Sequence, residues 1–252
     1  MKTIQINSFQ QLVEVLSNEE YSCGHMIYRG VKDINHKLIP SIGHLKEFKK
    51  KPLRDLVEHE KQILSLFRHR AYGELTKIPS NDWVWLALAQ HHGLPTRLLD
   101  WTHSPLIAAF FATEQVVNPD RSLSQICDEG CAIYAAHDCD YIDAFNTTKD
   151  PFATKESRLV YSPVVTNRIA GQGGLFTIHP DPRKEFQIDF EGKGKNDPRW
   201  IHKFTFSAVT AKEIQRVLFF LGIRKGNIFP DLDGFAGDIK FRFVIGDCHM
   251  PG

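Results

Sequence analysis

The 252-residue sequence lacks several features that would define its class at once. It has almost no excess charge, because 31 Lys and Arg stand against 30 Asp and Glu and leave a net charge of +1. Its longest apolar runs are far shorter than the ~20 residues that span a bilayer, and no internal repeat or low-complexity segment interrupts it. We therefore expect no membrane span and no field that draws the protein to DNA, RNA or anionic lipid, although nucleic acid is not excluded as a substrate.

Cysteine is also scarce, with an odd total of five: Cys23, Cys127, Cys131, Cys139 and Cys248. The first residues form an amphipathic pattern interrupted by Glu14, so we expect no signal peptide. These features favour a cytoplasmic protein with reduced thiols. Cys127, Cys131, His137 and Cys139 follow the spacing C-x3-C-x5-H-x-C, which suits zinc poorly, and we expect no metal.

The composition, 42% hydrophobic and 24% charged, is that of a globular protein. Its periodicity predicts helices at about 9–16, 53–72, 82–92, 105–117 and 211–222, and strands at 24–30, 96–101, 131–137, 175–179 and 200–207. Strands and helices do not alternate regularly, so the pattern indicates an α+β fold. We expect a single domain over 1–252, with an N-terminal helical part at about 1–90 and a core at about 91–252.

The densest cluster of polar and reactive groups lies between residues 90 and 105. It contains Gln90, His91, His92, Thr96, Arg97, Asp100, Trp101, Thr102, His103 and Ser104. Polar residues on both faces of a central strand are unfavourable unless they are paired. Two interpretations remain open: a structural Arg97–Asp100 pair with surface histidines, or a cleft lined by Thr, Asp and His.

Two further segments carry weaker signals. Arg29 comes at the end of a short apolar strand, directly before Gly30, where it could be an ordinary surface residue or clamp a phosphate with its planar fork of donors. Residues 167–174 are rich in glycine, which allows close backbone approach to a ligand but also suits a simple turn. No H-E-x-x-H, G-x-S-x-G or P-loop motif is present.

In these segments the sequence resembles the FRG domain family, named for a Phe/Tyr-Arg-Gly motif that is Tyr28-Arg29-Gly30 here. The other motifs are LAQHHGLPTRLLDWTHSPLIAAFFA (88–112), RIAGQGGLFT (168–177) and IFPDLDG (228–234). The resemblance extends over nearly the whole chain. It implies a role in bacterial or phage conflict systems, such as a toxin or an anti-phage defence protein.

The order of these motifs also resembles, more distantly, the ADP-ribosyltransferase fold, which implies mixed, mostly antiparallel sheets flanked by helices, with NAD as substrate. The implied catalytic residues are Arg29, His92, Asp100, Thr102 and Gln172, and the implied nucleotide-binding residues are Tyr28, Arg29, Gly30, His91, Thr96, Ser104 and Phe176. The sequence departs from that pattern at Gln172, where such transferases use a glutamate, because Gln cannot act as a base. Glu185, Asp100 and Asp231 are the alternative carboxylates.

Two functions follow from this reasoning. The first is an ADP-ribosyltransferase-like enzyme that transfers ADP-ribose to a protein or nucleic acid, or cleaves NAD. In it, Arg29 holds the diphosphate, while Asp100 orients Arg97 or acts as the base. The second is a non-catalytic sensor module that binds a nucleotide or a protein and controls a partner of the same system. A nuclease fits least, because metal-binding carboxylates at a convincing spacing are lacking.

We also make two structural predictions. Residues 28–30, 91–104 and 168–176 should converge on one cleft, because each segment carries polar groups or glycines at the end of an element. Arg97 and Asp100 should be buried or half-buried, and paired with the backbone or with each other, because apolar residues surround them in the sequence.

Overall fold

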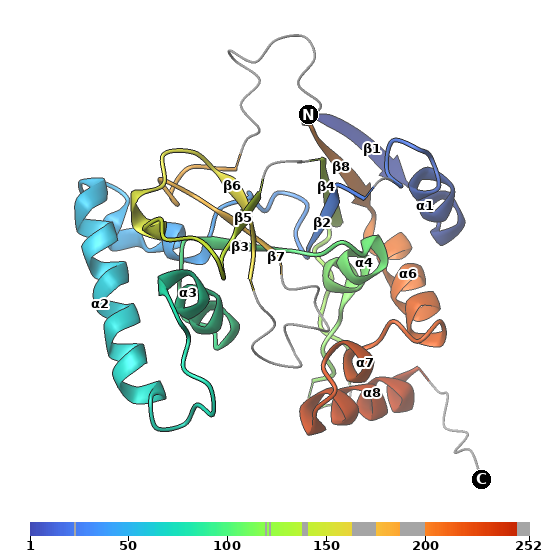
Figure 1. Ribbon diagram of the computed structural model, residues 1–252. Helices are drawn as coiled ribbons and strands as arrows, with labels where there is room; N and C mark the ends of the chain where they lie inside the picture. Colours follow the sequence, from blue (N-terminus) through green and yellow to red (C-terminus); the bar gives the residue numbers. More distant parts are fainter. Residues whose placement is uncertain are drawn as a thin grey trace.

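The computed structural model describes residues 1–22, 24–118, 120, 122–137, 141–162, 175–186 and 200–245. These residues form a single α+β fold with two four-stranded sheets, as Figure 1 shows. The first sheet consists of β1 (Lys2–Ile6), β8 (Trp200–Phe206), β4 (Cys131–His137) and β2 (Met26–Val31), in that order. The second consists of β3 (Leu98–Trp101), β7 (Leu175–Ile178), β6 (Arg158–Tyr161) and β5 (Tyr141–Asp143).

Both sheets are mixed and mostly antiparallel, as the sequence predicts. Only the outer pairs β1–β8 and β5–β6 are parallel, while the remaining neighbours are antiparallel. A two-residue bridge between Tyr28 and Thr102 joins the first sheet to the second. In this bridge each backbone N–H donates to the carbonyl of the other residue, at 2.7 and 2.8 Å. The edges of β2 and β3 are therefore held together where the two sheets meet.

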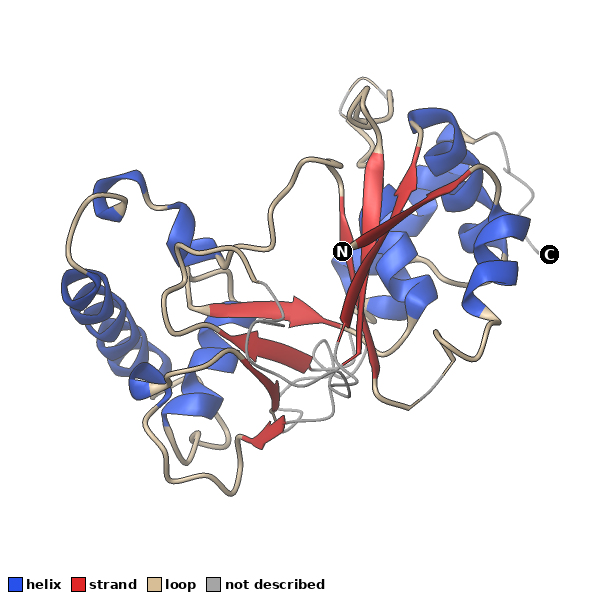
Figure 2. Cartoon of the chain, turned by 90° about the horizontal axis from the view of Figure 1, so that it is seen from above, coloured by secondary structure: helices blue, strands red, loops and turns tan. Residues whose placement is uncertain are grey.

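Helices cover the two outer faces of this arrangement, as Figure 2 shows from above. The first sheet is covered by α1 (Phe9–Leu16), α4 (Pro105–Thr113) and α6 (Ala208–Phe220), and α7 (Lys225–Ile228) and α8 (Leu232–Val244) follow. The second is covered by α2 (Leu53–Ala71) and α3 (Asp82–His91). Short 3-10 turns lie at Ser41–His44, Lys46–Phe48 and Pro151–Ala153. No helix in the described part of the chain is long and apolar enough to cross a membrane.

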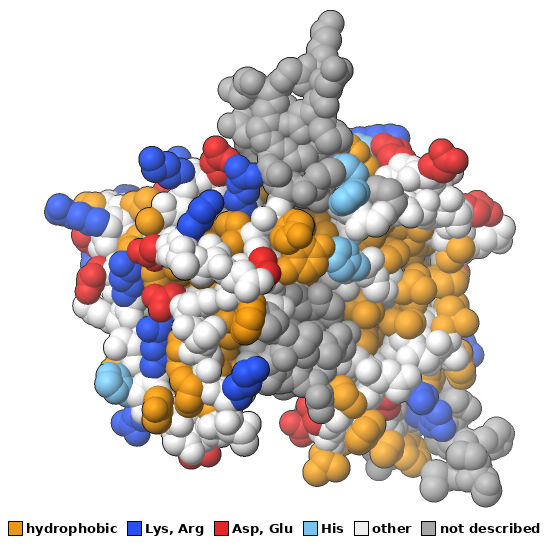
Figure 3. Space-filling view, in the orientation of Figure 1, with side chains coloured by type: hydrophobic (Ala, Val, Ile, Leu, Met, Phe, Trp, Pro, Cys, Tyr) orange, Lys and Arg blue, Asp and Glu red, His pale blue; other side chains and the backbone are white. Residues whose placement is uncertain are grey.

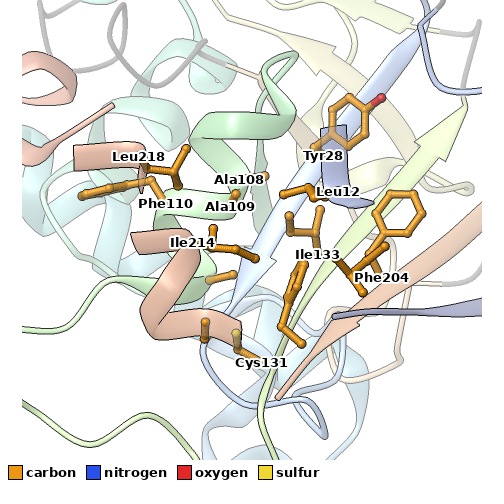
Figure 4. Packing of buried hydrophobic residues seen from close by; sticks show 14 of the residues in the cluster. Leu12, Tyr28, Ala108, Ala109, Phe110, Cys131, Ile133, Phe204, Ile214 and Leu218 are labelled. Atoms are coloured by element: carbon orange, nitrogen blue, oxygen red, sulfur yellow. The ribbon is translucent and has the colours of Figure 1, made fainter. Parts of the chain in front are cut away.

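The hydrophobic core has one cluster on each side of the first sheet. Figure 4 shows the outer cluster, in which Ala108 and Ala109 of α4 and Ile214 of α6 lie beside Ile133 of β4. The inner cluster lies between the two sheets and includes Ile27, Leu99 and Trp101. Because side chains alternate along a strand, both faces of the first sheet are apolar, which explains the nearly uninterrupted apolar sequence of β4.

Several helices begin directly after residues whose side chains cap them. Ser8, Asn81 and Ser104 cap α1, α3 and α4 with side chains that accept hydrogen bonds from backbone N–H groups in the first turn. Gly93 and Gly222 directly follow the C-caps of α3 and α6 (Ala208–Phe220), where their φ values of 81° and 83° favour glycine. The helix expected over 105–117 is shorter, because α4 ends at Thr113.

The expectation that Arg29 lies at the end of its strand is wrong, because β2 continues through Gly30 to Val31. A Cβ at Gly30 would lie 2.0 Å from the carbonyl oxygen of Ala108 in α4. The glycine is therefore needed where the helix backbone crosses the strand. The N-terminal part at about 1–90, which was expected to be helical, also contains the strands β1 and β2. These strands belong to the same sheet as β4 and β8.

Candidate functional site

A cavity of about 600 Å³ opens where the two sheets meet. Its walls come from β2 and the segment that follows it, from the end of α3, from β3 and β7, and from α4 and the segment after α7. The lining residues are Tyr28, Arg29, Gly30, Val31, Lys32, Asp33, His36, Gln90, His91, Asp100, Trp101, Thr102, Phe111, Leu175, Phe176 and Phe229. The structure thus brings together parts of all three segments that were expected to converge. Residues 168–174 of the third segment lie outside the described residues.

Arg29 projects from β2 toward the second sheet. It has the same parity along the strand as Ile27 and Val31, whose side chains lie in the cluster between the sheets. Its Nη1 donates to the backbone carbonyl of Asp100 at 2.7 Å and lies 3.6 Å from the Asp100 carboxylate. Its Nε is buried and has no hydrogen-bond partner among the described residues. The part of the chain that the structure describes therefore leaves one cationic donor in the cavity wall without a partner.

The surroundings of Arg29 act on the pKa of its guanidinium in two opposite directions. Burial lowers the pKa of its guanidinium, and the charge and hydrogen bonding of Asp100 counteract that shift. The group still stays protonated at any working pH. At His36, burial first and then the charges of Arg29 and His44 lower the pKa of the imidazole. This part of the cavity therefore holds a permanently charged guanidinium beside an imidazole whose pKa is lowered, with the carboxylates of Asp33 and Asp100 in the same lining.

Asp100 is held by a chain of side-chain hydrogen bonds. Thr96 Oγ1 donates to Gln90 Oε1 at 2.6 Å, and Gln90 Nε2 donates to Asp100 Oδ2 at 2.9 Å. Thr96 itself is buried and absent from the lining of the cavity, whereas the Asp100 carboxylate is 48% exposed. Thr96 therefore orients the amide of Gln90, and that amide fixes the carboxylate.

Arg97 is fully buried as predicted, but the Arg97–Asp100 pair, one of the arrangements expected, is wrong. Arg97 Nε donates to Oε2 of Glu60 in α2 at 2.8 Å, and its backbone N–H donates to Oε1 of the same carboxylate, also at 2.8 Å. On a strand, residues 97 and 100 lie on opposite faces, so Asp100 faces Arg29 instead. This leaves Asp100 in the cavity and gives Arg97 a structural role.

The polar residues that follow β3 have mainly structural contacts. The Thr102 backbone pairs with Tyr28, and its Oγ1 accepts a hydrogen bond from the Ser104 N–H at 3.1 Å. Ser104 caps α4 and does not line the cavity. His103 Nδ1 lies 3.0 Å from the carbonyl of Met26, and its Nε2 lies 3.0 Å from the hydroxyl of Tyr161. Of these residues, Thr102 alone lines the cavity.

The two adjacent histidines at the end of α3 occupy different places. His91 lines the cavity, whereas His92 is exposed and is absent from its lining. The ring of His92 lies 6.1 Å from that of Phe67 in α2. The two rings are nevertheless in edge-to-face contact, with centroids 5.0 Å apart, so they differ in access to the cavity and not in their neighbourhood. His91 is therefore the histidine of this pair that can reach a ligand there.

The FRG domain profile matches residues 24–121. Residues 24–121 are an FRG domain. The match includes Tyr28-Arg29-Gly30 and the whole of the 88–112 motif, and it ends before the 168–177 and 228–234 motifs. No curated protein and no solved structure matches the chain significantly, so the resemblance to the ADP-ribosyltransferase fold stays a prediction.

The FRG domain supplies the polar walls of the cavity, and the rest of the chain adds apolar ones. Leu175 and Phe176 come from β7, and Phe229 comes from the 228–234 motif. Phe176 was expected in the site from the sequence, whereas Phe229 was not. Lys32 and His36, which follow the Tyr28-Arg29-Gly30 motif, and Phe111, which lies inside the 88–112 motif, were also not expected in the site.

Gln172 lies outside the described residues, so the alternative carboxylates matter for any chemistry here. Asp100 lines the cavity next to the FRG arginine. Asp231 accepts a hydrogen bond from the Gly234 N–H at 2.7 Å and caps α8. Glu185 lies near Tyr134, where burial and then the Glu185 charge raise the pKa of the phenol. Neither Asp231 nor Glu185 lines the cavity.

The cysteines of the possible zinc motif do not form a metal site in the described part of the chain. There, no group of three or more His, Cys, Asp or Glu side chains could hold a metal ion. Cys127 and Cys131 are free thiols, and burial first, then Cys127, raises the pKa of Cys131 to about 12. Cys139 lies outside the described residues.

Proposed function

We propose that the cavity between the two sheets binds a nucleotide diphosphate, and that its ligand is NAD, used in an ADP-ribosyltransferase-like reaction. The observation that carries this proposal is Arg29, a half-buried cation that lines a cavity of about 600 Å³ and whose buried Nε has no partner among the described residues. A guanidinium binds two phosphate oxygens at once through its planar fork of donors. The Nε of Arg29 is therefore suited to donate a hydrogen bond to one of these phosphate oxygens.

The neighbours of Arg29 match the other parts of a nucleotide. Asp100, oriented by Gln90, offers carboxylate oxygens that can accept hydrogen bonds from ribose hydroxyls. His91 and Lys32 add polar groups, and Phe111 and Phe229, whose ring centroids are 6.1 Å apart, form an apolar wall. A cavity of this size with a few polar groups among aromatic rings is typical of small-molecule sites.

For the chemistry, Asp100 is the best-placed residue in the described part of the cavity. Loss of nicotinamide from NAD leaves positive charge on the ribose carbon, and a nearby fixed carboxylate stabilises such charge electrostatically. Asp100 would supply that charge, Arg29 would hold the diphosphate, and Gln172 could bind a ribose hydroxyl without acting as a base. The acceptor would be a protein, a nucleic acid or water. The proposed setting in a bacterial or phage conflict system is supported by the resemblance to the FRG family.

Calorimetric titration with NAD tests the binding step. Arg29→Ala should weaken NAD binding by about 2–3 kcal/mol, the worth of hydrogen bonds to a charged group. Arg29→Lys should recover only part of this loss, because an ammonium cannot make the bidentate contact. Arg54→Ala, at an arginine 87% exposed on α2, is the matched control and should bind like wild type. Equal affinity in all four proteins would contradict the phosphate clamp.

Release of nicotinamide separates the enzyme from its alternative, a sensor module that binds a nucleotide or protein without turnover. Gln172, where transferases of this kind use glutamate, favours that alternative. For the enzyme, wild type should release nicotinamide from NAD, and Asp100→Asn should lose most of this activity while retaining NAD binding. NAD binding without release would favour the sensor, and absence of NAD binding by wild type would contradict the proposal.

A further inference from the structure

The outward face of α8 exposes a row of large apolar side chains. Leu232, Phe235, Ile239 and Phe243 are 85, 48, 57 and 63% exposed. They are three or four residues apart, so they form one stripe along the helix, while Phe241 on the opposite face is buried. Figure 3 shows hydrophobic side chains along the lower edge of the molecule, over the region where α8 lies in Figure 1. A contiguous apolar patch of this kind usually marks an interaction surface.

The charges beside this stripe have opposite signs at its two ends. Asp233 lies in the first turn of α8 and Lys240 lies two turns later, and both are exposed. Seven residues apart on a helix, they lie on the same flank of the stripe. That flank is therefore negative toward the N-terminus of the helix and positive toward its C-terminus.

We propose that α8 is a homodimer interface, in which it packs against α8 of a second copy in antiparallel orientation about a two-fold axis. In such a pair the two helices run in opposite directions. The flank that carries Asp233 and Lys240 on one helix lies beside the same flank of the other helix. Asp233 of each copy then lies opposite Lys240 of the second copy, so that two ion pairs border the apolar seam. An interface with two-fold symmetry must be complementary to itself, and the order of charges on this flank meets that condition.

The stripe itself suits this pairing. Leu232, Phe235 and Ile239 follow the alternating spacing of three and four residues by which two helices interdigitate along a seam. Ala236 is also exposed between them and leaves room for close approach. These residues lie outside the 24–121 segment matched to the FRG domain, so the interface is a feature of this chain's own C-terminal region.

Light scattering after size-exclusion chromatography tests the interface directly. The wild-type protein should have twice the 28.8 kDa mass of one chain. Ile239→Asp should make the protein monomeric, because the substitution places a charge in the seam. The melting temperature of this variant should stay close to that of wild type diluted to a concentration at which it is monomeric. Val209→Asp, at a residue 79% exposed on α6, is the control and should stay dimeric. A wild-type monomer at about 100 µM would overturn the proposal, as would a dimer that Ile239→Asp leaves intact.

Charge exchange identifies the occupant as a second copy in this orientation. Asp233→Lys and Lys240→Asp should each raise the dimer dissociation constant about tenfold, because each turns two attractions into repulsions. Mixing the two variants should restore a dimer that contains one chain of each, since a positive and a negative side chain then meet at both ion pairs. Absence of this restoration would overturn the antiparallel arrangement. A monomeric wild type that instead uses the stripe for a different protein would overturn the homodimer.

Discussion

Arg97 and Glu60 form an ion pair that is closed to solvent, with side-chain exposures of 0 and 1%. Burial raises the pKa of the Glu60 carboxyl, and the charge and hydrogen bonds of Arg97 act against that shift. Arg97 also lies over the ring of Phe152, 4.9 Å from its centroid. Such a pair adds little net stability compared with apolar residues, but loss of one partner leaves a buried charge without compensation.

Glu60→Gln should therefore lower the free energy of unfolding by about 3–5 kcal/mol. The double variant Glu60→Met/Arg97→Met should recover most of this loss, because it removes both charges and keeps apolar volume. Urea unfolding of the two variants and wild type gives the values. A loss below about 1 kcal/mol in Glu60→Gln would contradict the structural role that we assign to this pair.

The burial of Arg97 could be predicted from its apolar neighbours, but its partner could not be found by looking nearby in the sequence. Glu60 is 37 residues away and lies four residues from both Leu56 and Leu64, on the buried face of α2. A charged residue in the middle of an apolar helical stripe is the signal that would have identified it, because a buried carboxylate needs a cationic partner.

His179 should make the protein sensitive to mild acid. Burial, with the charges of Arg29 and Arg97, lowers the pKa of its imidazole to about 3, below the ordinary value of 6.5. The unfolded chain therefore binds a proton that the folded protein does not, so this contribution to stability is present above pH 6.5 and is lost as the pH falls toward 3. His179→Gln should reduce the slope of unfolding free energy between pH 6 and 4 by about 1.4 kcal/mol per pH unit.

The slope follows from urea unfolding at several pH values. His69→Gln, at an exposed position on α2, is the control and should keep the wild-type slope. Identical slopes for wild type and His179→Gln would contradict a neutral, buried imidazole.

At the scale of elements, the contact between β2 and α4 depends on Gly30. A Cβ there would lie 2.0 Å from the Ala108 carbonyl oxygen and 2.6 Å from the Ala112 nitrogen, both backbone atoms. Gly30→Ala should therefore push strand and helix apart and lower the free energy of unfolding by at least about 3 kcal/mol. Gly24→Ala is the matched control, because a Cβ at Gly24 has nothing within 4 Å. Equal melting temperatures for the two variants would contradict this packing.

The helices and the central strands could be predicted because their signals are local. Caps, periodicity and the glycines after helices lie within the elements themselves, as at Ser104, Gly93 and Gly222. The outer strands β1 and β5 could not be predicted, because both are short. In addition, β1 pairs in parallel with β8, which is far away in the sequence, and β5 pairs in parallel with β6 in an irregular segment. The helix α8 was not among the helices predicted above, and its 13 residues carry an apolar face that lies on the surface.

At the scale of the whole molecule, the site forms because two sheets meet at one bridge. Tyr28 and Thr102 pair there, and this pairing brings Arg29 and Asp100 to the same wall. The sequence could predict that these segments converge, because each carries polar groups at the end of an element. It could not predict Phe229, because its side chain reaches the cavity only through the packing of the C-terminal helices.

A crystal structure of the protein soaked with NAD tests the central claim most directly. We expect the diphosphate within hydrogen-bond distance of the Arg29 guanidinium, with its Nε as one donor, and a ribose hydroxyl at the Asp100 carboxylate. Soaking should be done at a concentration that saturates binding in solution. NAD bound away from Arg29, or a cavity without NAD under these conditions, would contradict the account.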